Sequence, residues 1–214
     1  MIIQRVIKGI GGIDDADVQD IFDAGIVCNW WRNLGRALQR VEIHGKLSDR
    51  NLDWHQNSFD KSDPLEGGQT FSQHTPFIST TAGTVSRDTS AKTNTLTPAW
   101  RIALYFATKQ WMTDGWLFYC HLFVIGKQAT VMEPFSEELR ELNIYHGYSL
   151  YQPEGEITAK IVIPAAQIER ADFWCLADVK AALQKGVLPA PLRSIGNSKF
   201  VPADNYNNLR DLLL

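Results

Sequence analysis

The sequence has no apolar run long enough to cross a membrane, and its first residues lack the layout of a signal peptide. Cysteine is scarce: only Cys28, Cys120 and Cys175 are present, at spacings that match no metal-binding motif. An odd number of widely separated cysteines is typical of free, buried thiols in a reducing compartment. We therefore expect a cytoplasmic protein that holds no metal and does not bind a membrane.

Excess positive charge is also missing. The chain has 21 basic and 24 acidic residues, for a net charge of −3. Without a global basic surface, general nucleic-acid binding is not indicated, although a local patch stays open. Internal repeats and low-complexity tracts are absent as well. What is present is 44% apolar residues over 214 positions, enough for one sizeable core.

Apolar spacing and turn residues predict a mixture of short strands and helices. We expect strands over residues 2–7, 77–81, 116–125, 161–163 and 169–174. Helices are expected after the caps at Asp14 and Thr97, and over 30–40, 136–140 and 178–185. Residues 45–75, 82–89 and 145–153 are polar and are expected to be irregular. Because helices concentrate early and strands late, the pattern favours the α+β class.

Two carboxylates, Glu154 and Glu156, stand one residue apart at the start of the β-rich stretch 151–164. Side chains two apart on a strand share a face, so an extended Glu154 would project into the same space as Glu156. Like charges that close are unfavourable unless something cationic lies between them. The pair therefore predicts a site for positive charge: a cationic substrate, a developing carbocation or a metal.

Three separated pieces of the chain line up with this pair: Arg5, the strand Ser79-Thr80-Thr81, and Glu154-x-Glu156. Their order resembles the arginine–serine–glutamate class of mono-ADP-ribosyltransferases, which includes the catalytic subunits of cholera and pertussis toxins. In that family an Ile-Pro follows seven residues after the catalytic glutamate, and Ile163-Pro164 stands there. The resemblance implies a split β-sandwich of two small sheets with flanking helices. It implies a catalytic domain over 1–174, with 175–214 as a C-terminal extension packed on it.

The resemblance also implies roles for these residues. NAD would be the substrate, cleaved at its nicotinamide–ribose bond through an oxocarbenium-like state that Glu156 stabilises. Arg5 would bind the pyrophosphate or ribose, and Ser79 would orient Glu156. Thr80 would also contact NAD. Arg5, Ser79 and Glu156 are thus expected to converge on one dinucleotide-sized cleft.

Further residues enter through the same resemblance. His55 lies upstream of the Ser79 strand, as a functional histidine does in the pertussis subunit, and is expected to contact NAD. His44, in Ile43-His44-Gly45, is a rival that resembles the His–Tyr–Glu class, but no tyrosine stands at position 79. Arg87, in the polar segment after Thr81, is a candidate phosphate contact.

The acceptor of ADP-ribose is indicated by Glu154. In the family, a glutamate two residues before the catalytic one accompanies arginine as the acceptor, because a guanidinium must be bound and deprotonated before it can attack. A nucleobase amine would need a similar carboxylate, so RNA or DNA stays open as the acceptor. Tyr148 and Tyr151 precede the pair, where the family places its target-recognition loop, and could stack on the acceptor.

These inferences predict a mono-ADP-ribosyltransferase that transfers ADP-ribose from NAD to a macromolecule, with protein arginine favoured. Such a chain would be a bacterial toxin or effector, active in the cytoplasm of its producer or of a target cell after delivery. An intracellular toxin would have a neutralising antitoxin or immunity protein as a partner. The alternatives are nucleobase modification, NAD hydrolysis with water as acceptor, and a non-enzymatic binding module.

Overall fold

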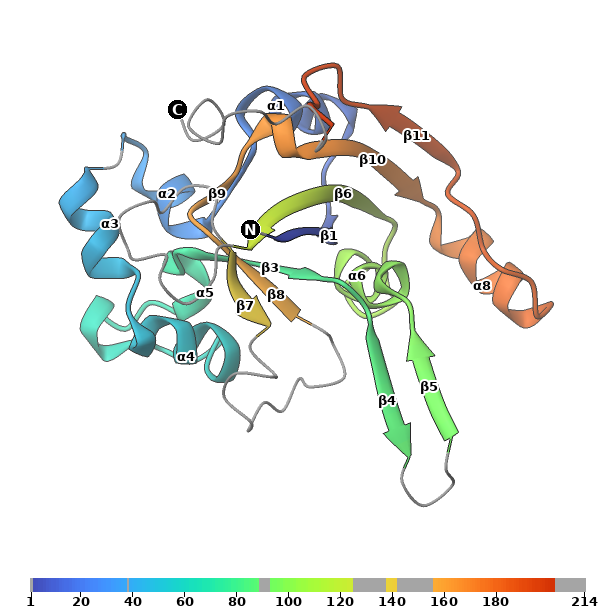
Figure 1. The fold of residues 1–214 in the computed structure, drawn as a ribbon, viewed down its shortest axis with the longest axis horizontal. Helices are drawn as coiled ribbons and strands as arrows, with labels where there is room; N and C mark the ends of the chain where they lie inside the picture. The colour runs from blue at the N-terminus through green and yellow to red at the C-terminus, as the bar shows by residue number, and fades with distance from the viewer. Residues whose placement is uncertain (1, 38, 89–92, 125–137, 142–155, 203–214) are drawn as a thin grey trace.

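A computed structural model describes residues 2–37, 39–88, 93–124, 138–141 and 156–202. They form an α+β fold around an antiparallel seven-stranded sheet with the order β11-β10-β6-β1-β3-β8-β7, which confirms the expected class (Figure 1). The strands of this sheet are β1 (Ile2–Gly11), β3 (Phe77–Thr81), β6 (Gly115–Val124), β7 (Glu138–Glu141), β8 (Glu156–Lys160), β10 (Ile168–Trp174) and β11 (Arg193–Gly196). Two small sheets pair β2 (Ile26–Val27) with β9 (Val162–Ile163), and β4 (Thr84–Asp88) with β5 (Thr93–Thr97).

The large sheet is divided by a seam between β1 and β3. On one side, β1 pairs with β6 along its whole length, from Ile2 opposite Val124 to Gly11 opposite Gly115. On the other side, β1 meets β3 through one register pair, Ile7 opposite Thr81. The sheet therefore consists of two halves, β11-β10-β6-β1 and β3-β8-β7, as expected for a split arrangement.

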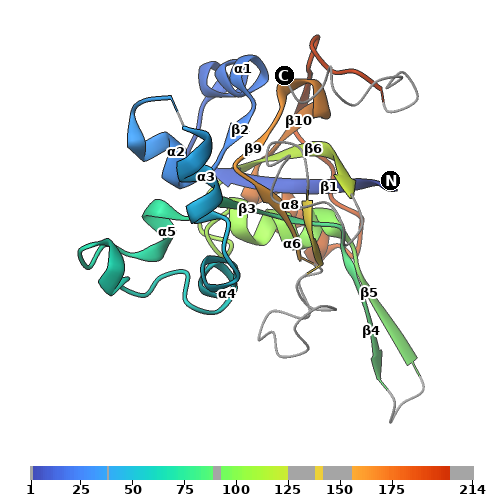
Figure 2. The ribbon, with the colours of Figure 1, turned by 60° about the vertical axis from the view of Figure 1, so that its left-hand side comes forward.

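Helices cover both halves of the sheet. They are α1 (Asp15–Ala24), α2 (Asn29–Leu34), α3 (Arg40–Lys46), α4 (Asp49–Asn57), α5 (Phe71–His74), α6 (Ala99–Ala107) and α8 (Leu176–Gln184), with 3-10 turns η1 (Pro64–Glu66) and η3 (Ala165–Gln167). Figures 1 and 2 both show α2 to α5 gathered beside the β3–β8 half. None of the helices in the described part of the chain is long and apolar enough to cross a membrane.

Several local expectations were wrong. The stretch 45–75 is not irregular, because Ser48 caps α4 and Thr70 caps α5. The helix expected over 30–40 ends at Leu34, where Gly35 takes the left-handed conformation, and a new helix, α3, follows. Residues 84–88 form a hairpin with β5 that projects from the body of the molecule in both views (Figures 1 and 2).

One predicted helix is a strand instead. Residues 138–141 form β7 at the edge of the sheet, where they pair with β8, whereas 136–140 was expected to be helical. The free energy of completing a sheet edge here overrides a local helical preference.

The main core cluster joins both halves of the sheet, with Val6, Ile78, Phe118 and Ile157 among its members. All three cysteines are free; Cys28 and Cys120 are buried, and burial raises the pKa of the Cys28 thiol to about 11. Beyond residue 175, β11 pairs with β10, and Val179 of α8 belongs to a second core cluster.

Candidate active site at the seam of the sheet

A cavity of about 410 Å³ opens at the seam between the two half-sheets. Its floor contains Lys8 from β1, Ser79 from β3, Glu156 from β8 and His55 from α4. These four residues are widely separated in the sequence, and the sheet register and the helical layer bring them together. Charged and hydroxyl groups that converge in one cavity are typical of an active site.

The pairing of β3 with β8 places Glu156 beside Ser79. Glu156 lies opposite Thr81 and Ser79 lies opposite Thr158 in this register. Since opposite residues of an antiparallel pair share a face, and residues two apart do as well, all four side chains project from the same side of the sheet. Glu156 is the first residue of β8, so its carboxylate stands at the end of the strand that faces the seam.

His55, in the last turn of α4, connects this strand pair to the helical layer. Its Nε2 lies 2.8 Å from Ser79 Oγ, and its Nδ1 lies 2.8 Å from Thr75 Oγ1. Nε2 is also 3.5 Å from Glu156 Oε1. Two phenyl rings border the buried imidazole edge-on, with ring centroids 5.5 and 5.6 Å away: Phe59 and Phe77. The imidazole is therefore held in one orientation.

The ends of this hydrogen-bonded chain fix the direction of its bonds. The backbone N–H of Phe77 donates to Thr75 Oγ1 at 3.2 Å, and an ionised Glu156 can only accept. The hydroxyl of Ser79 therefore donates a hydrogen bond to the carboxylate of Glu156 and accepts one from Nε2–H of His55. In the neutral imidazole Nδ1 then accepts from Thr75, and in the protonated ring both nitrogens donate. In either state the Nε2–H group of His55 points to Ser79.

Glu156 is ionised although its side chain is only 9% exposed. Burial alone would raise its pKa, but the contacts with His55, the hydrogen bond from Ser79 and the charge of Lys8 outweigh this effect. The pKa of Glu156 consequently lies below its ordinary value. The hydroxyl of Thr158 donates a further, longer hydrogen bond at 3.4 Å. A fixed carboxylate anion of this kind stabilises positive charge that develops next to it.

Lys8, and not Arg5, is the basic residue that β1 brings to the site. Lys8 lines the cavity, whereas the Arg5 guanidinium donates to Glu169 on β10 at 2.6 Å, with 60% of its side chain exposed. Arg5 does not line this cavity. The expectation that Arg5 would join Ser79 and Glu156 in one cleft is therefore wrong.

A second cavity, of about 250 Å³, adjoins the first at the same seam. Both cavities are lined by Lys8, Gly9, His55, Phe59 and Ser79. The second cavity adds Arg32 from α2. Burial lowers the pKa of Lys8; the charge of Glu156 opposes this shift, and that of Arg32 adds to it. Two cations and one carboxylate, spread over two adjoining cavities, suit a substrate that carries phosphates at one part and develops positive charge at another.

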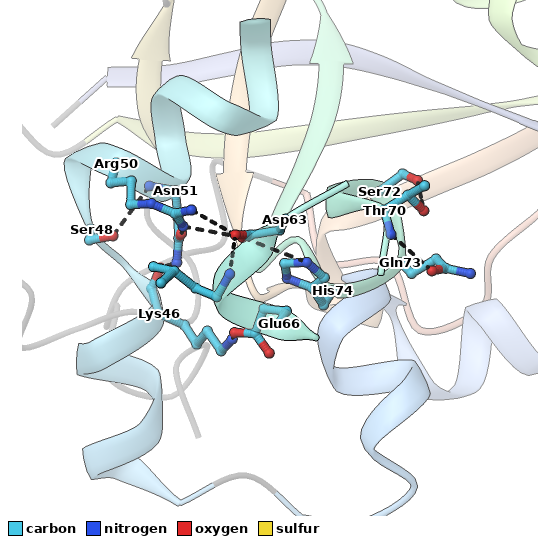
Figure 3. A network of polar contacts seen from close by, with 11 residues as sticks. Lys46, Ser48, Arg50, Asn51, Asp63, Glu66, Thr70, Ser72, Gln73 and His74 are labelled. Carbon is cyan, nitrogen blue, oxygen red and sulfur yellow. Dashed lines mark hydrogen bonds and ion pairs between the residues drawn. The ribbon is translucent and has the colours of Figure 1, made fainter. Parts of the chain in front are cut away.

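The position of α4, and therefore of His55, depends on a buried ion-pair network (Figure 3). At its centre Asp63 is fully buried and accepts from Arg50 at 2.7 and 3.2 Å, and its Oδ1 also accepts from the backbone N–H of Leu65 at 3.0 Å. Arg50 holds the pKa of Asp63 below its ordinary value. His74 lies 3.8 Å from Asp63 on the opposite side. The network joins α4, η1 and α5 into one unit behind the cavity.

The remaining predicted residues are placed as follows. Thr80 is buried and lines the larger cavity, and its hydroxyl donates to the carbonyl of Ile157 at 2.5 Å. His44 is half-buried on α3 and lines neither cavity. Arg87 lies on β4, opposite Asn94 of β5. Glu154, Tyr148 and Tyr151 lie outside the described residues, so their predicted roles stay predictions.

Lys8 was missed from the sequence, although a signal was present. It is a lone charge in the apolar run Val6-Ile7-Lys8-Gly9-Ile10. A charged side chain in such a run is unfavourable to bury, so its presence there indicates a role. The structure also explains the glycine at position 9, because a Cβ there would lie 2.1 Å from the carbonyl oxygen of Ala103. The lack of a side chain lets α6 pack closely against the strand beside Lys8.

Comparisons with known proteins give structural likenesses only. No protein-family model and no curated protein matches the sequence. The solved structure of EcPltA has a TM-score of 0.47 and 14% identity, with 94% of this chain and 89% of that chain covered. A single-residue mutant of heat-labile enterotoxin gives a TM-score of 0.43 at 12% identity, covering 94% of this chain and 79% of that one.

A double mutant of heat-labile enterotoxin is similar, with a TM-score of 0.46, 11% identity, and coverage of 94% of this chain and 64% of that one. At such identities and TM-scores these likenesses establish neither the family nor the activity. The function must therefore be inferred from the chemistry of the site.

Proposed function

We propose that this protein cleaves NAD at its nicotinamide–ribose bond and transfers ADP-ribose to a macromolecular acceptor. The observation that carries the proposal is the buried, ionised Glu156, held by the Ser79–His55 chain in a cavity that also contains Lys8. The motifs of Ser79 and Glu156 resemble those of the arginine–serine–glutamate transferases. Protein arginine is the favoured acceptor, and the protein would act as a toxin or effector.

In the proposed reaction the bond between the ribose C1′ and the nicotinamide nitrogen breaks, and its electron pair leaves with nicotinamide. Positive charge develops on the ribose, where the carboxylate of Glu156 stabilises it. The acceptor nitrogen then forms a bond to C1′ and releases one proton to a base or to solvent. Because Glu156 is already ionised and oriented, little reorganisation is needed in the transition state, and such groups account for about 10²–10³ in rate.

The phosphates of NAD need cationic partners, which Lys8 and Arg32 would provide in place of Arg5. Lys8 lines both cavities and Arg32 lines the smaller one. A lysine binds phosphate as a point charge rather than through the planar fork of an arginine. On β1 a lysine would thus take the place of the arginine of the motif, and the positive charge would be kept.

The proposal is tested with NAD that carries a label in its adenylate part. We expect label in a protein acceptor with the wild-type chain, and loss of both transfer and NAD cleavage by about 10²-fold or more in the Glu156→Gln variant. Unchanged NAD with the folded wild-type protein would contradict the proposal. Label in nucleic acid would identify a nucleobase acceptor, and free ADP-ribose alone would identify an NAD glycohydrolase.

A further inference from the structure

Exposed residues around the mouth of the larger cavity differ in kind from the less accessible residues of its floor. We call the following group the mouth: Phe59, Asp60, Tyr105, Phe106 and Gln110. All five are exposed, and the three rings have 37%, 36% and 50% of their surface accessible. Exposed aromatic rings that line a cavity, rather than pack in a core, are typical of a binding surface.

One side of the mouth is a turn after α4 whose backbone is tied to α5. The carbonyl of Phe59 accepts from the backbone N–H of Ser72 at 2.7 Å, and the carbonyl of Lys61 accepts from that of Phe71 at 2.9 Å. The intervening Asp60 therefore has a fixed backbone and an exposed carboxylate. The ring of Phe59 lies edge-on to His55, so this side of the mouth adjoins the catalytic floor.

The other side of the mouth is a strained turn that follows α6. Lys109, Gln110 and Trp111 have φ angles of 48°, 60° and 67°, in the left-handed region that residues other than glycine rarely adopt. Hydrogen bonds hold them there: the N–H of Gln110 donates to the carbonyl of Tyr105 at 2.8 Å, and that of Trp111 donates to Thr108 Oγ1 at 3.1 Å. Strain that the surroundings enforce in this way clusters at functional sites.

The chemistry of the mouth favours a planar cation. Three aromatic faces, the carboxylate of Asp60 and the amide oxygen of Gln110 all attract positive charge or accept hydrogen bonds. Among the described residues that line this cavity, Lys8 is the only lysine or arginine, and it belongs to the floor. Lys61 and Lys109 are exposed in the two turns but do not line this cavity, so the phosphates of a nucleobase acceptor would meet the carboxylate of Asp60 inside it without a lysine or arginine of the mouth to bind them.

We infer that the mouth binds the acceptor, and that the group it binds is the guanidinium of an arginine side chain. Asp60 accepts the hydrogen bonds of the guanidinium, and the rings of Phe59, Tyr105 and Phe106 enclose its flat faces. This inference rests on the proposed function, because the guanidinium is then held beside the carbon that Glu156 activates. It does not depend on Glu154, and it assigns specificity to residues of α6 and of the turn after α4.

The test uses the full chain, labelled NAD, and agmatine as a small guanidinium acceptor. We expect Asp60→Asn to raise the KM for agmatine about tenfold or more, the range of a charge-assisted hydrogen bond, with little change in the KM for NAD. Phe106→Ala should raise the same KM by a smaller factor. Asp60→Glu should restore most of the loss, since it keeps the charge. An alkyl amine of similar length should be a much poorer acceptor than agmatine.

Two matched controls accompany these variants. Asp20, on the exposed face of α1, and Leu188, which is 79% exposed beyond α8, line neither cavity. Asp20→Asn and Leu188→Ala should leave all constants unchanged. Equal KM values for agmatine in the wild type and Asp60→Asn would overturn the inference while NAD cleavage continues. If the folded wild-type protein does not cleave NAD at all, the proposed function fails first and this inference fails with it.

Discussion

Replacing Ser79 with alanine is the sharpest test of how the carboxylate is held. Ser79 accepts from His55 at 2.8 Å and donates to Glu156, so the substitution removes the central link of the chain. Alanine is smaller than serine and keeps the strand, so no steric cost is added. What remains is a buried carboxylate with one donor fewer and a buried N–H group of His55 without its acceptor.

The expected loss of stability in Ser79→Ala follows from the burial of His55 and Glu156. A hydrogen bond to a charged group contributes about 1.5–3 kcal/mol, and a buried donor left unpaired costs about 1–3 kcal/mol. His55 Nε2 is 3.5 Å from Glu156 Oε1 and can move closer to the carboxylate, which recovers part of this loss. We therefore expect Ser79→Ala to lower the free energy of unfolding by about 1–3 kcal/mol near neutral pH.

The pH dependence has a definite sign. The pKa of Glu156 is lowered in the folded state. Its contribution to stability is therefore fully present above the pKa that the same carboxyl has in the unfolded chain. That contribution is lost as the pH falls through the folded-state pKa. Because Ser79→Ala raises this pKa, the variant should lose the contribution at a higher pH than the wild type. The difference between the two proteins should be largest near neutrality and should shrink in acid.

Urea unfolding of both proteins over a pH series measures this difference, and the acid limb of NAD cleavage should move in the same direction. Ser198→Ala is a suitable control, since Ser198 is exposed and lines neither cavity. Equal stability of Ser79→Ala and the wild type at every pH would refute the hydrogen-bonded chain as the support of Glu156.

Three further predictions concern β1. Lys8→Met should raise the KM for NAD about 10- to 100-fold by removing a charged contact. Lys8→Arg should move the basic limb of the rate profile to higher pH, because the pKa of Lys8 is lowered. Arg5→Ala should change the same KM less than about twofold, since an exposed ion pair contributes only about 0–1 kcal/mol; a loss comparable to that of Lys8→Met would restore Arg5 to the site. Gly9→Ala should destabilise the fold by about 1–3 kcal/mol or more in thermal unfolding, because its Cβ would overlap the carbonyl oxygen of Ala103, and an unchanged melting temperature would contradict that packing.

Much of the site was predictable because the relevant strands have clear signals. The runs around Ser79 and Glu156 are rich in β-branched residues, and alternation along each strand determines which side chains share a face. Antiparallel pairing of β3 with β8 then places Glu156 and Ser79 together. His55 was selected through a resemblance, and the structure brings it to Ser79 although the stretch around it was expected to be irregular.

The failures have physical reasons too. Which basic residue of β1 lines the cavity is a long-range property of the folded sheet, which the sequence around Arg5 and Lys8 alone cannot reveal. The helices α4 and α5 are short and contain few apolar residues, and the Asp63 network, rather than helical propensity, stabilises their arrangement. The left-handed turn at 109–111 is held by local hydrogen bonds to Tyr105 and Thr108, and it contains no glycine from which it could have been predicted.

The single register pair between Ile7 and Thr81 has a mechanical consequence. A ladder this short adds few hydrogen bonds across the seam, so the two half-sheets are joined mainly by the packing of residues such as Val6, Ile78 and Ile157. A substrate in contact with Lys8 on one half-sheet and Glu156 on the other would add a further connection across the seam. We expect the amide protons of β1 and β3 at the seam to exchange with solvent more slowly once such a substrate is bound, while those between β6 and β10 keep their rate.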